Sequence, residues 1–379
     1  MPTKPNRAGK QQNYVPKGNG DASGEYGDNA TGSNKHIQFT TFKKPKNQTK
    51  VREKKKIRFR YNNVYKQWFP MTDKEWEQWQ KQKENAEKYG YYGYRDEKIE
   101  EKELNVLDEQ DTNQAKEDIY KQVEKDIDNA TIDNIKDFVG LSYYMTPKVT
   151  ESIENSLSKN YELNQQEAAY FIKSNTLFTD EQKKQLSEKA DKKALELADT
   201  YIKDNFKKIK GEHTIEQDLK SVNPKYGENR YYGINCQRCS FAYELRRRGY
   251  DVEAYPNKND FGWGSMWKTQ MQFKEQYVFK NRQLGSRGVA NKIIEKVKNA
   301  GEGSRWAVDV QWARSTSGHL FIAENVGGEV KFFDAQTGNQ DCMRYFNNIA
   351  TTKETFIYRM DNADFNYGVK ETGFSPKGE

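Results

Sequence analysis

The residues whose types and spacing could do chemistry lie in the last third of the chain, and the first of them is Cys236. It stands in the run 233–249, GINCQRCSFAYELRRRG, which has the composition of a short helix with a basic last turn. Asn235 is a good N-cap residue, and Gly249 is a typical residue just past a helix C-terminus. The pattern predicts Cys236 in the first turn, where free backbone N–H groups and the helix dipole favour a thiolate.

A histidine and an aspartate follow on two predicted strands. His319 opens the alternating run 318–325, and Asp334 ends the run 329–335, with Asn-Val-Gly-Gly at 325–328 between them. This turn sequence predicts a hairpin. Since about equal numbers of residues separate His319 and Asp334 from the turn, the simple register makes them neighbours.

The other two histidines offer no comparable position. His36 lies in a low-complexity stretch, and His213 lies in a polar Gly-Glu-His-Thr connector. Among the three histidines, His319 alone stands at the entrance of a predicted strand.

A cysteine, a histidine and an aspartate in this arrangement can carry out acyl transfer. The Cys236 thiolate would attack an amide carbon, His319 would supply and recover protons, and Asp334 would fix the imidazole tautomer. The tetrahedral intermediate also needs donors for its oxyanion. The backbone N–H of Cys236 is the first candidate, and the side-chain amides of Gln336 and Asn235 are weaker ones.

Other roles for the cysteines remain open. A Cys236-x-x-Cys239 pair at a helix start is also a redox arrangement, although the expected βαβ context is missing upstream. Cys236, Cys239, Cys342 and one histidine could supply four zinc ligands, but a second closely spaced pair is absent. A structural thiol is the third possibility. Cys239 shares a helical face with Ala242 and Leu245, so it is predicted to face the core and is the secondary candidate nucleophile, whereas Cys236 is offset toward a cleft.

Taken together, these parts resemble the papain-fold toxin family of glutamine deamidases. The resemblance covers roughly residues 215–365 and rests on Asn235-Cys236-x-x-Cys239, Ala242, Arg248-Gly249, Val252, Gly318-His319 and Asp334-x-Gln336-Thr337-Gly338. It implies a papain-like fold with Cys236 as nucleophile, His319 as base and Asp334 as the group that orients it. Members of that family often form the C-terminal part of polymorphic toxins or of phage head-associated proteins.

Composition limits how much of the 379-residue chain can pack, because only 34% of it is apolar and 31% is charged. Residues 1–56 carry 13 basic against 4 acidic residues with little apolar periodicity, so we predict a disordered basic tail. Such a tail is suited to bind nucleic acid or an acidic protein surface, and a solubilising linker is the alternative.

The remaining chain divides into three predicted parts, which together give an α+β fold. Residues 57–112 should hold a short strand, a helix that bears Trp76 and Trp79, and an acidic linker. Helical spacing of apolar residues predicts a helical region over 113–212. The papain-like domain is expected over 213–379.

The function that follows is deamidation of protein glutamine side chains by a toxin or a phage-delivered effector. A cysteine protease with the same triad, a transglutaminase, and a noncatalytic phage virion or adaptor protein are the alternatives. The expected partners are a protein substrate and either an immunity protein or a phage structural protein. No cofactor or metal is expected, and no apolar run is long enough to span a membrane. Three cysteines form no disulfide framework, so synthesis in the cytoplasm is expected, followed by virion association or delivery into a target cell.

Overall fold

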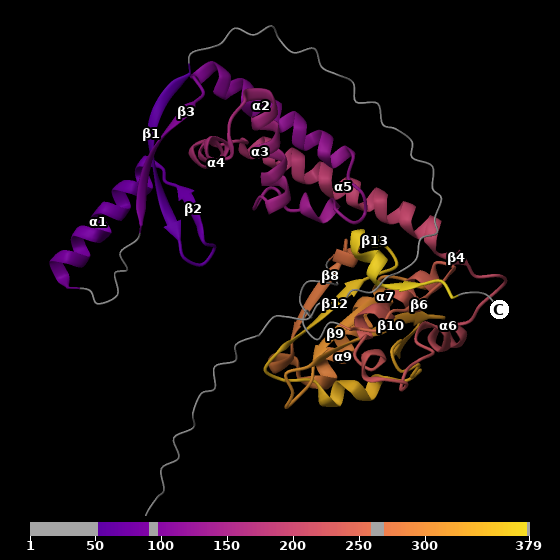
Figure 1. Ribbon diagram of the computed structural model, residues 1–379. Coiled ribbons are helices and arrows are strands. Elements are labelled where there is room, and N and C mark those ends of the chain that lie inside the picture. Colours follow the sequence, from indigo (N-terminus) through magenta and orange to yellow (C-terminus); the bar gives the residue numbers. More distant parts are fainter. Residues whose placement is uncertain (1–51, 91–97, 259–268, 377–379) are drawn as a thin grey trace, which may run out of the picture. The chain divides into compact units, whose positions relative to one another are not determined.

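The computed structural model describes residues 52–90, 98–258 and 269–376 (Figure 1). The predicted basic tail lies outside the described residues up to position 51. The end of the predicted tail, residues 53–56, is instead ordered as the start of strand β1 (Glu53–Asn62).

A small antiparallel sheet opens the described chain. β1 is its central strand, between β2 (Gln67–Pro70) and β3 (Ile99–Val106). The acidic stretch predicted as a linker therefore contains a strand. Charge explains this difference, since the lysine-rich β1 faces the glutamate-rich β3, with Lys56 Nζ 3.7 Å and Arg58 Nε 3.6 Å from the Glu101 carboxylate.

The tryptophan-bearing helix α1 (Asp73–Tyr89) forms as its end signals predict. Thr72 and Glu75 make a reciprocal capping box, and Gly90 ends the helix with a positive φ of 61°. Trp76 and Trp79 stack with ring centroids 5.0 Å apart. The two rings thus share one face of the helix, as the spacing predicts.

Four α-helices and a 3-10 turn form the next region, with a buried apolar cluster of their own. They are α2 (Glu109–Asp128), η1 (Ile135–Asp137), α3 (Pro147–Tyr161), α4 (Gln165–Ser174) and α5 (Asp180–Asn205). Ala198 and Ile202 in the last turns of α5 belong instead to the buried cluster around α7. The helical region and the C-terminal domain therefore share core residues.

The C-terminal domain is built on a five-stranded antiparallel sheet in the order β11-β10-β9-β12-β8. The strands are β8 (Gln276–Lys280), β9 (Arg305–Gln311), β10 (Gly318–Val326), β11 (Glu329–Phe333) and β12 (Glu354–Arg359). Strands β10 and β11 coincide closely with the alternating runs predicted at 318–325 and 329–335. Gly327 and Gly328, both with positive φ, form the two-residue turn between β10 and β11.

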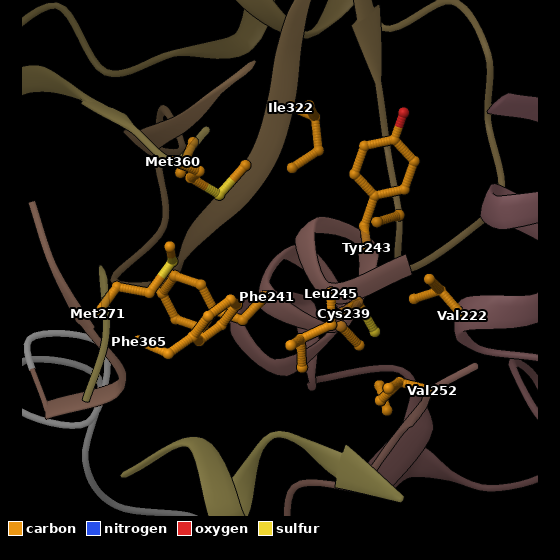
Figure 2. Packing of buried hydrophobic residues seen from close by; sticks show 14 of the residues in the cluster. Val222, Cys239, Phe241, Tyr243, Leu245, Val252, Met271, Ile322, Met360 and Phe365 are labelled. Atoms are coloured by element: carbon orange, nitrogen blue, oxygen red, sulfur yellow. The ribbon is translucent and has the colours of Figure 1, made fainter. Parts of the chain in front are cut away.

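Alternation along the strands gives the sheet two apolar faces. Ala307, Ile322 and Phe333 pack in the cluster that contains helix α7 (Cys236–Arg247), shown in Figure 2. Their sequence neighbours Val308 and Phe321 pack in the cluster that contains α9 (Asn281–Asn299). Successive strand residues point to opposite faces, so the two helices cover opposite sides of the sheet.

Short elements complete the domain. They are helix α6 (Ile215–Val222), the 3-10 turns η2 (Arg230–Tyr232), η3 (Met343–Asn348) and η4 (Tyr367–Glu371), and the strand pairs β4 (Lys207–Lys208) with β5 (Tyr250–Asp251), β6 (Glu253–Ala254) with β14 (Gly373–Phe374), and β7 (Met271–Gln272) with β13 (Asp364–Phe365). None of the helices that the structure describes is long and apolar enough to cross a membrane.

Candidate functional site

Helix α7 places Cys236 at its first residue. The helix ends at Arg247, and Gly249 follows with a φ of 85°, as the sequence predicts. The N-cap prediction is only half right, because Asn235 occupies the N-cap position but its side chain makes no capping hydrogen bond. The Asn235 side chain thus leaves the first-turn N–H groups of α7 with their donor capacity.

The two cysteines of α7 are both buried, with exposed fractions of 2% for Cys236 and 0% for Cys239. The core position predicted for Cys239 is confirmed (Figure 2). Burial, reinforced by the nearby Cys236 and Asp334, raises the pKa of Cys239 well above its ordinary value. Cys239 therefore stays a neutral thiol. The open cleft expected beside Cys236 is not matched by its exposure, since Cys236 is a buried member of the α7 cluster.

His319 is the second residue of β10, and its ring joins Cys236 to Asp334. Its Nε2 lies 3.1 Å from Asp334 Oδ2. Burial opposes a charge on the ring, but hydrogen bonds to Asp334 and Cys236 outweigh it and raise the pKa of His319 to about 10. The imidazole is thus protonated at neutral pH. With Nε2 turned to Asp334, Nδ1 is the nitrogen left for the sulfur.

Asp334 directly follows β11 and is 1% exposed. Burial would raise its pKa, but the hydrogen bond and charge of His319, with a hydrogen bond from Tyr345, hold the pKa below its usual value. The Tyr345 hydroxyl donates to Oδ2 at 2.7 Å, and the Gln336 backbone N–H donates to Oδ1 at 2.9 Å. Asp334 is therefore an ionised acceptor held from several sides.

The side chains predicted as weaker oxyanion donors are engaged with each other. Gln336 Nε2 donates to Asn235 Oδ1 at 3.3 Å, and Asn235 Nδ2 donates to Asn223 Oδ1 at 3.2 Å and to the Tyr255 carbonyl at 3.1 Å. This buried amide cluster connects the residue before the thiol to the residue two past Asp334. Its geometry suits positioning better than oxyanion binding.

The residues that could have served as zinc ligands with Cys236 and Cys239 are not gathered at one place. His213 Nδ1 lies 2.8 Å from Asp218 Oδ2, and His36 lies outside the described residues. Cys342 is buried, and burial together with the Asp334 charge raises its pKa to about 12. Within residues 52–90, 98–258 and 269–376, no group of three potential metal ligands is assembled.

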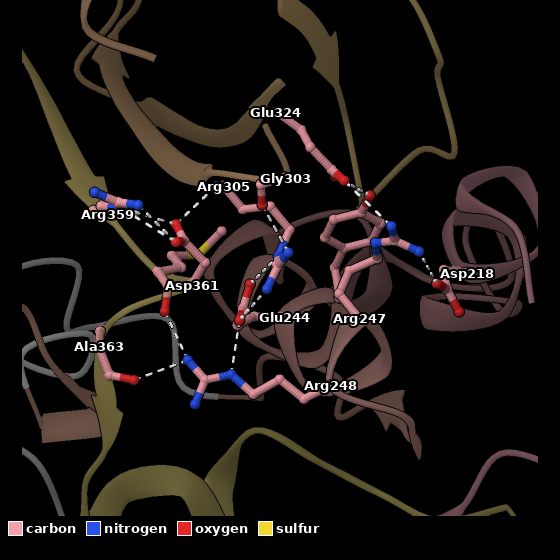
Figure 3. Close-up of polar contacts among 12 residues, drawn as sticks. Asp218, Glu244, Arg247, Arg248, Gly303, Arg305, Glu324, Arg359, Asp361 and Ala363 are labelled. Atoms are coloured by element: carbon pink, nitrogen blue, oxygen red, sulfur yellow. Dashed lines mark hydrogen bonds and ion pairs between the residues drawn. The ribbon is translucent and has the colours of Figure 1, made fainter. Parts of the chain in front are cut away.

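A buried polar network fixes α7 against the strand that carries His319 (Figure 3). Glu324, near the end of β10, accepts a hydrogen bond from the Tyr243 hydroxyl at 2.6 Å and from Arg247 at 3.3 Å. Glu244 accepts from Arg305 of β9 at 2.7 Å and from Arg248 at 2.7 Å. Because α7 and β10 also carry Cys236 and His319, these contacts set the relative placement of the two reactive groups.

Two aromatic residues at the site were missed by sequence reasoning. Trp312 stacks on the His319 ring at 5.7 Å, and Tyr345 meets both rings edge-on. An aromatic residue just past β9, across the hairpin from His319, is a signal that could have identified Trp312. Tyr345 lies in η3, where no sequence pattern distinguishes it from the other tyrosines of the chain.

Comparison with known proteins gives a family match over the segment that contains these residues. None of the curated proteins or solved structures gives a significant match. A family model does match, and it covers residues 234–339, from the start of α7 to just beyond Asp334. That segment of the C-terminal domain is similar to the family described as papain fold toxin 1, glutamine deamidase.

Proposed function

We propose that the C-terminal domain is a Cys-His-Asp acyl-transfer enzyme that deamidates glutamine side chains of proteins. The observation that carries the proposal is the imidazole of His319, which lies 3.1 Å from Asp334 and whose raised pKa has Cys236 and Asp334 as its causes. The family match over residues 234–339 gives the reaction class, glutamine deamidation. A toxin, or an effector delivered with a phage particle, is the setting that this family suggests.

The chemistry assigns a role to each group. The Cys236 sulfur attacks the side-chain amide carbon of glutamine, and the protonated His319 gives its proton to the departing nitrogen, so that the C–N bond breaks and ammonia leaves. Water, deprotonated by His319, then attacks the thioester and releases a glutamate side chain and the thiol. Asp334 holds the imidazole and stabilises its charge. The backbone N–H of Cys236 is the oxyanion donor, because the N–H groups in the first turn of a helix have no partner within the helix.

The same first step also serves a protease or a transglutaminase, so product analysis must separate them. Purified protein is incubated with casein and with a cytosolic protein mixture, and tryptic peptides are analysed by mass spectrometry. Deamidation gives the small mass increase of an amide-to-acid conversion at glutamine. Cleaved backbones would indicate a protease, and glutamine–lysine cross-links a transglutaminase.

Variants tie the product to the site. Cys236→Ala and His319→Ala should abolish the mass increase, whereas the matched changes Cys342→Ala and His213→Ala should leave it. No modification by wild-type protein, with Cys236 unreactive to alkylation, would favour a noncatalytic virion or adaptor protein. The basic tail, an immunity protein and a phage structural protein remain proposed binding elements and partners, to be tested by pull-down with the intact chain.

A further inference from the structure

A carboxylate that the proposed mechanism does not use lies on β9, the strand that pairs with β10. Asp309 lies on β9 directly opposite Leu320 of β10 and Phe356 of β12. Side chains of directly paired residues project from the same face of a sheet. Leu320 belongs to the buried cluster that also contains Cys236, and Phe356 packs against that cluster. Asp309 therefore projects on the side of the sheet that carries the Cys236 cluster, and its neighbour Val310 is the residue opposite His319.

The Asp309 side chain is partly buried and has no donor among the residues that the structure describes. Burial raises its pKa to about 6, and the charge of His319 opposes the rise. A carboxylate that is partly removed from water loses part of its hydration, and this loss disfavours its charged form. At neutral pH the group nevertheless remains an ionised acceptor, close enough to His319 for their charges to interact.

A glutamine side chain can supply the hydrogen-bond donor that Asp309 lacks among the described residues. Its two methylene groups suit the apolar Leu320 and Phe356 beside the carboxylate, and its amide NH₂ group carries two donors. The product, a glutamate side chain, carries only acceptors and a negative charge. We propose that Asp309 is a specificity-determining residue that accepts a hydrogen bond from the substrate amide nitrogen and repels the carboxylate product.

This inference rests on the proposed function and adds to it a reason why the site binds the glutamine substrate and releases the glutamate product. Deamidation turns a neutral donor into an anion, so one fixed carboxylate binds the substrate and disfavours the product. The same charge attracts the ammonium ion formed from the leaving nitrogen. Discrimination between an amide and an acid of equal size depends on such an unpaired polar group more than on shape.

The test uses two small alkylating reagents that mimic substrate and product. Iodoacetamide carries the neutral primary amide, and iodoacetate carries the carboxylate, while both form the same bond to the Cys236 sulfur with loss of iodide. Rates at Cys236 are measured by peptide mass spectrometry at about pH 8, where Asp309 is ionised. The readout is the iodoacetate-to-iodoacetamide rate ratio, which needs no protein substrate and no turnover.

Asp309→Asn should raise this ratio about tenfold, the effect of removing one unit charge several ångströms from the reagent's carboxylate. The matched control Asp341→Asn removes an exposed carboxylate from the loop after Asp334 and should leave the ratio unchanged. Asp309→Ser serves the same purpose should the asparagine variant fold poorly. An unchanged ratio in a folded Asp309 variant, or an equal rise in Asp341→Asn, would overturn the inference.

A second measurement follows turnover of a short glutamine peptide by ammonia release. The matching glutamate peptide should inhibit Asp309→Asn about tenfold more strongly than wild type, while KM for the glutamine peptide rises. If wild-type protein releases no ammonia from peptides or proteins, the proposed function fails whatever the alkylation ratio shows. If ammonia is released but Asp309→Asn shows neither altered product inhibition nor an altered alkylation ratio, only the Asp309 inference fails.

Discussion

Replacing Glu244 by glutamine should destabilise the C-terminal domain strongly, because Glu244 is the buried anion that holds two arginines against α7. Its carboxylate accepts from Arg305 Nε at 2.7 Å and Nη2 at 3.0 Å, and from Arg248 Nε at 2.7 Å (Figure 3). The Glu244 side chain is 0% exposed, and that of Arg305 is 14% exposed. Glutamine keeps the size of the side chain but removes the charge.

Removing one partner of a buried ion pair typically costs 3–5 kcal/mol of unfolding free energy, and about 3 kcal/mol is expected here. The low end applies because both arginines keep carbonyl acceptors. Arg305 donates to the Gly303 carbonyl at 2.9 Å, and Arg248 donates to the Met360 and Ala363 carbonyls at 2.7 and 2.8 Å.

The assay is urea unfolding of the full chain followed by near-UV circular dichroism, with a double-mutant cycle that adds Arg305→Met. The second change should cost less in the Glu244→Gln background than in wild type, since it removes a cation that has already lost its partner. Glu295→Gln, which removes an exposed carboxylate paired with Lys292, is the matched control and should have no measurable effect. A loss below about 1 kcal/mol for Glu244→Gln, or additive effects in the cycle, would refute this reasoning.

Three further predictions address the site. Cys236→Ala and Cys239→Ala each remove a buried sulfur and should each lower the unfolding free energy by about 1 kcal/mol, while only Cys236→Ala abolishes deamidation; the reverse pattern of activity would move the nucleophile to Cys239. Tyr345→Phe removes the 2.7 Å hydrogen bond to Asp334 but keeps the ring on His319, so the unfolding free energy should fall by about 1 kcal/mol. Turnover should fall severalfold, a smaller loss of turnover than in Asp334→Ala. Unchanged turnover would show that Tyr345 does not position Asp334. Folding raises the pKa of His319 from 6.5 to about 10, so the contribution of His319 to the unfolding free energy should be complete below about pH 6.5 and be lost as the pH rises toward about 10. In urea unfolding, His319→Gln should remove this pH dependence. Equal slopes of unfolding free energy against pH for the two proteins would contradict the prediction.

Local signals in the sequence were enough to predict the elements that carry Cys236, His319 and Asp334. The glycines at 327 and 328 specify a tight turn, and the turn with the alternating strands fixes the register that brings His319 to Asp334. Gly249 likewise ends α7 where expected. These features depend on residues close together in the chain, so a single sequence contains them.

Features that depend on distant residues could not be predicted in this way. Asn235 fails to cap α7 because its amide is held by Asn223 and Gln336, the second of which is 101 residues away. The stretch around Glu101 looks like a solvated linker until the lysines of β1 are placed beside it. Asp309 was overlooked, although a lone carboxylate in the otherwise apolar centre of RWAVDVQ is an unusual residue for a buried strand.

The central claim is that Cys236 and His319 act as a pair, and alkylation of Cys236 tests it most directly. Initial rates with iodoacetamide near neutral pH should be highest in wild type, because the protonated ring favours the reactive thiolate. The rate should fall at least tenfold in His319→Ala and less in Asp334→Ala, which weakens only the charge and orientation of the ring. His213→Ala should react as wild type does. Equal alkylation rates at Cys236 in folded wild type and His319→Ala would show that the two residues are not partners, and would leave the domain with the fold of the family but without its chemistry.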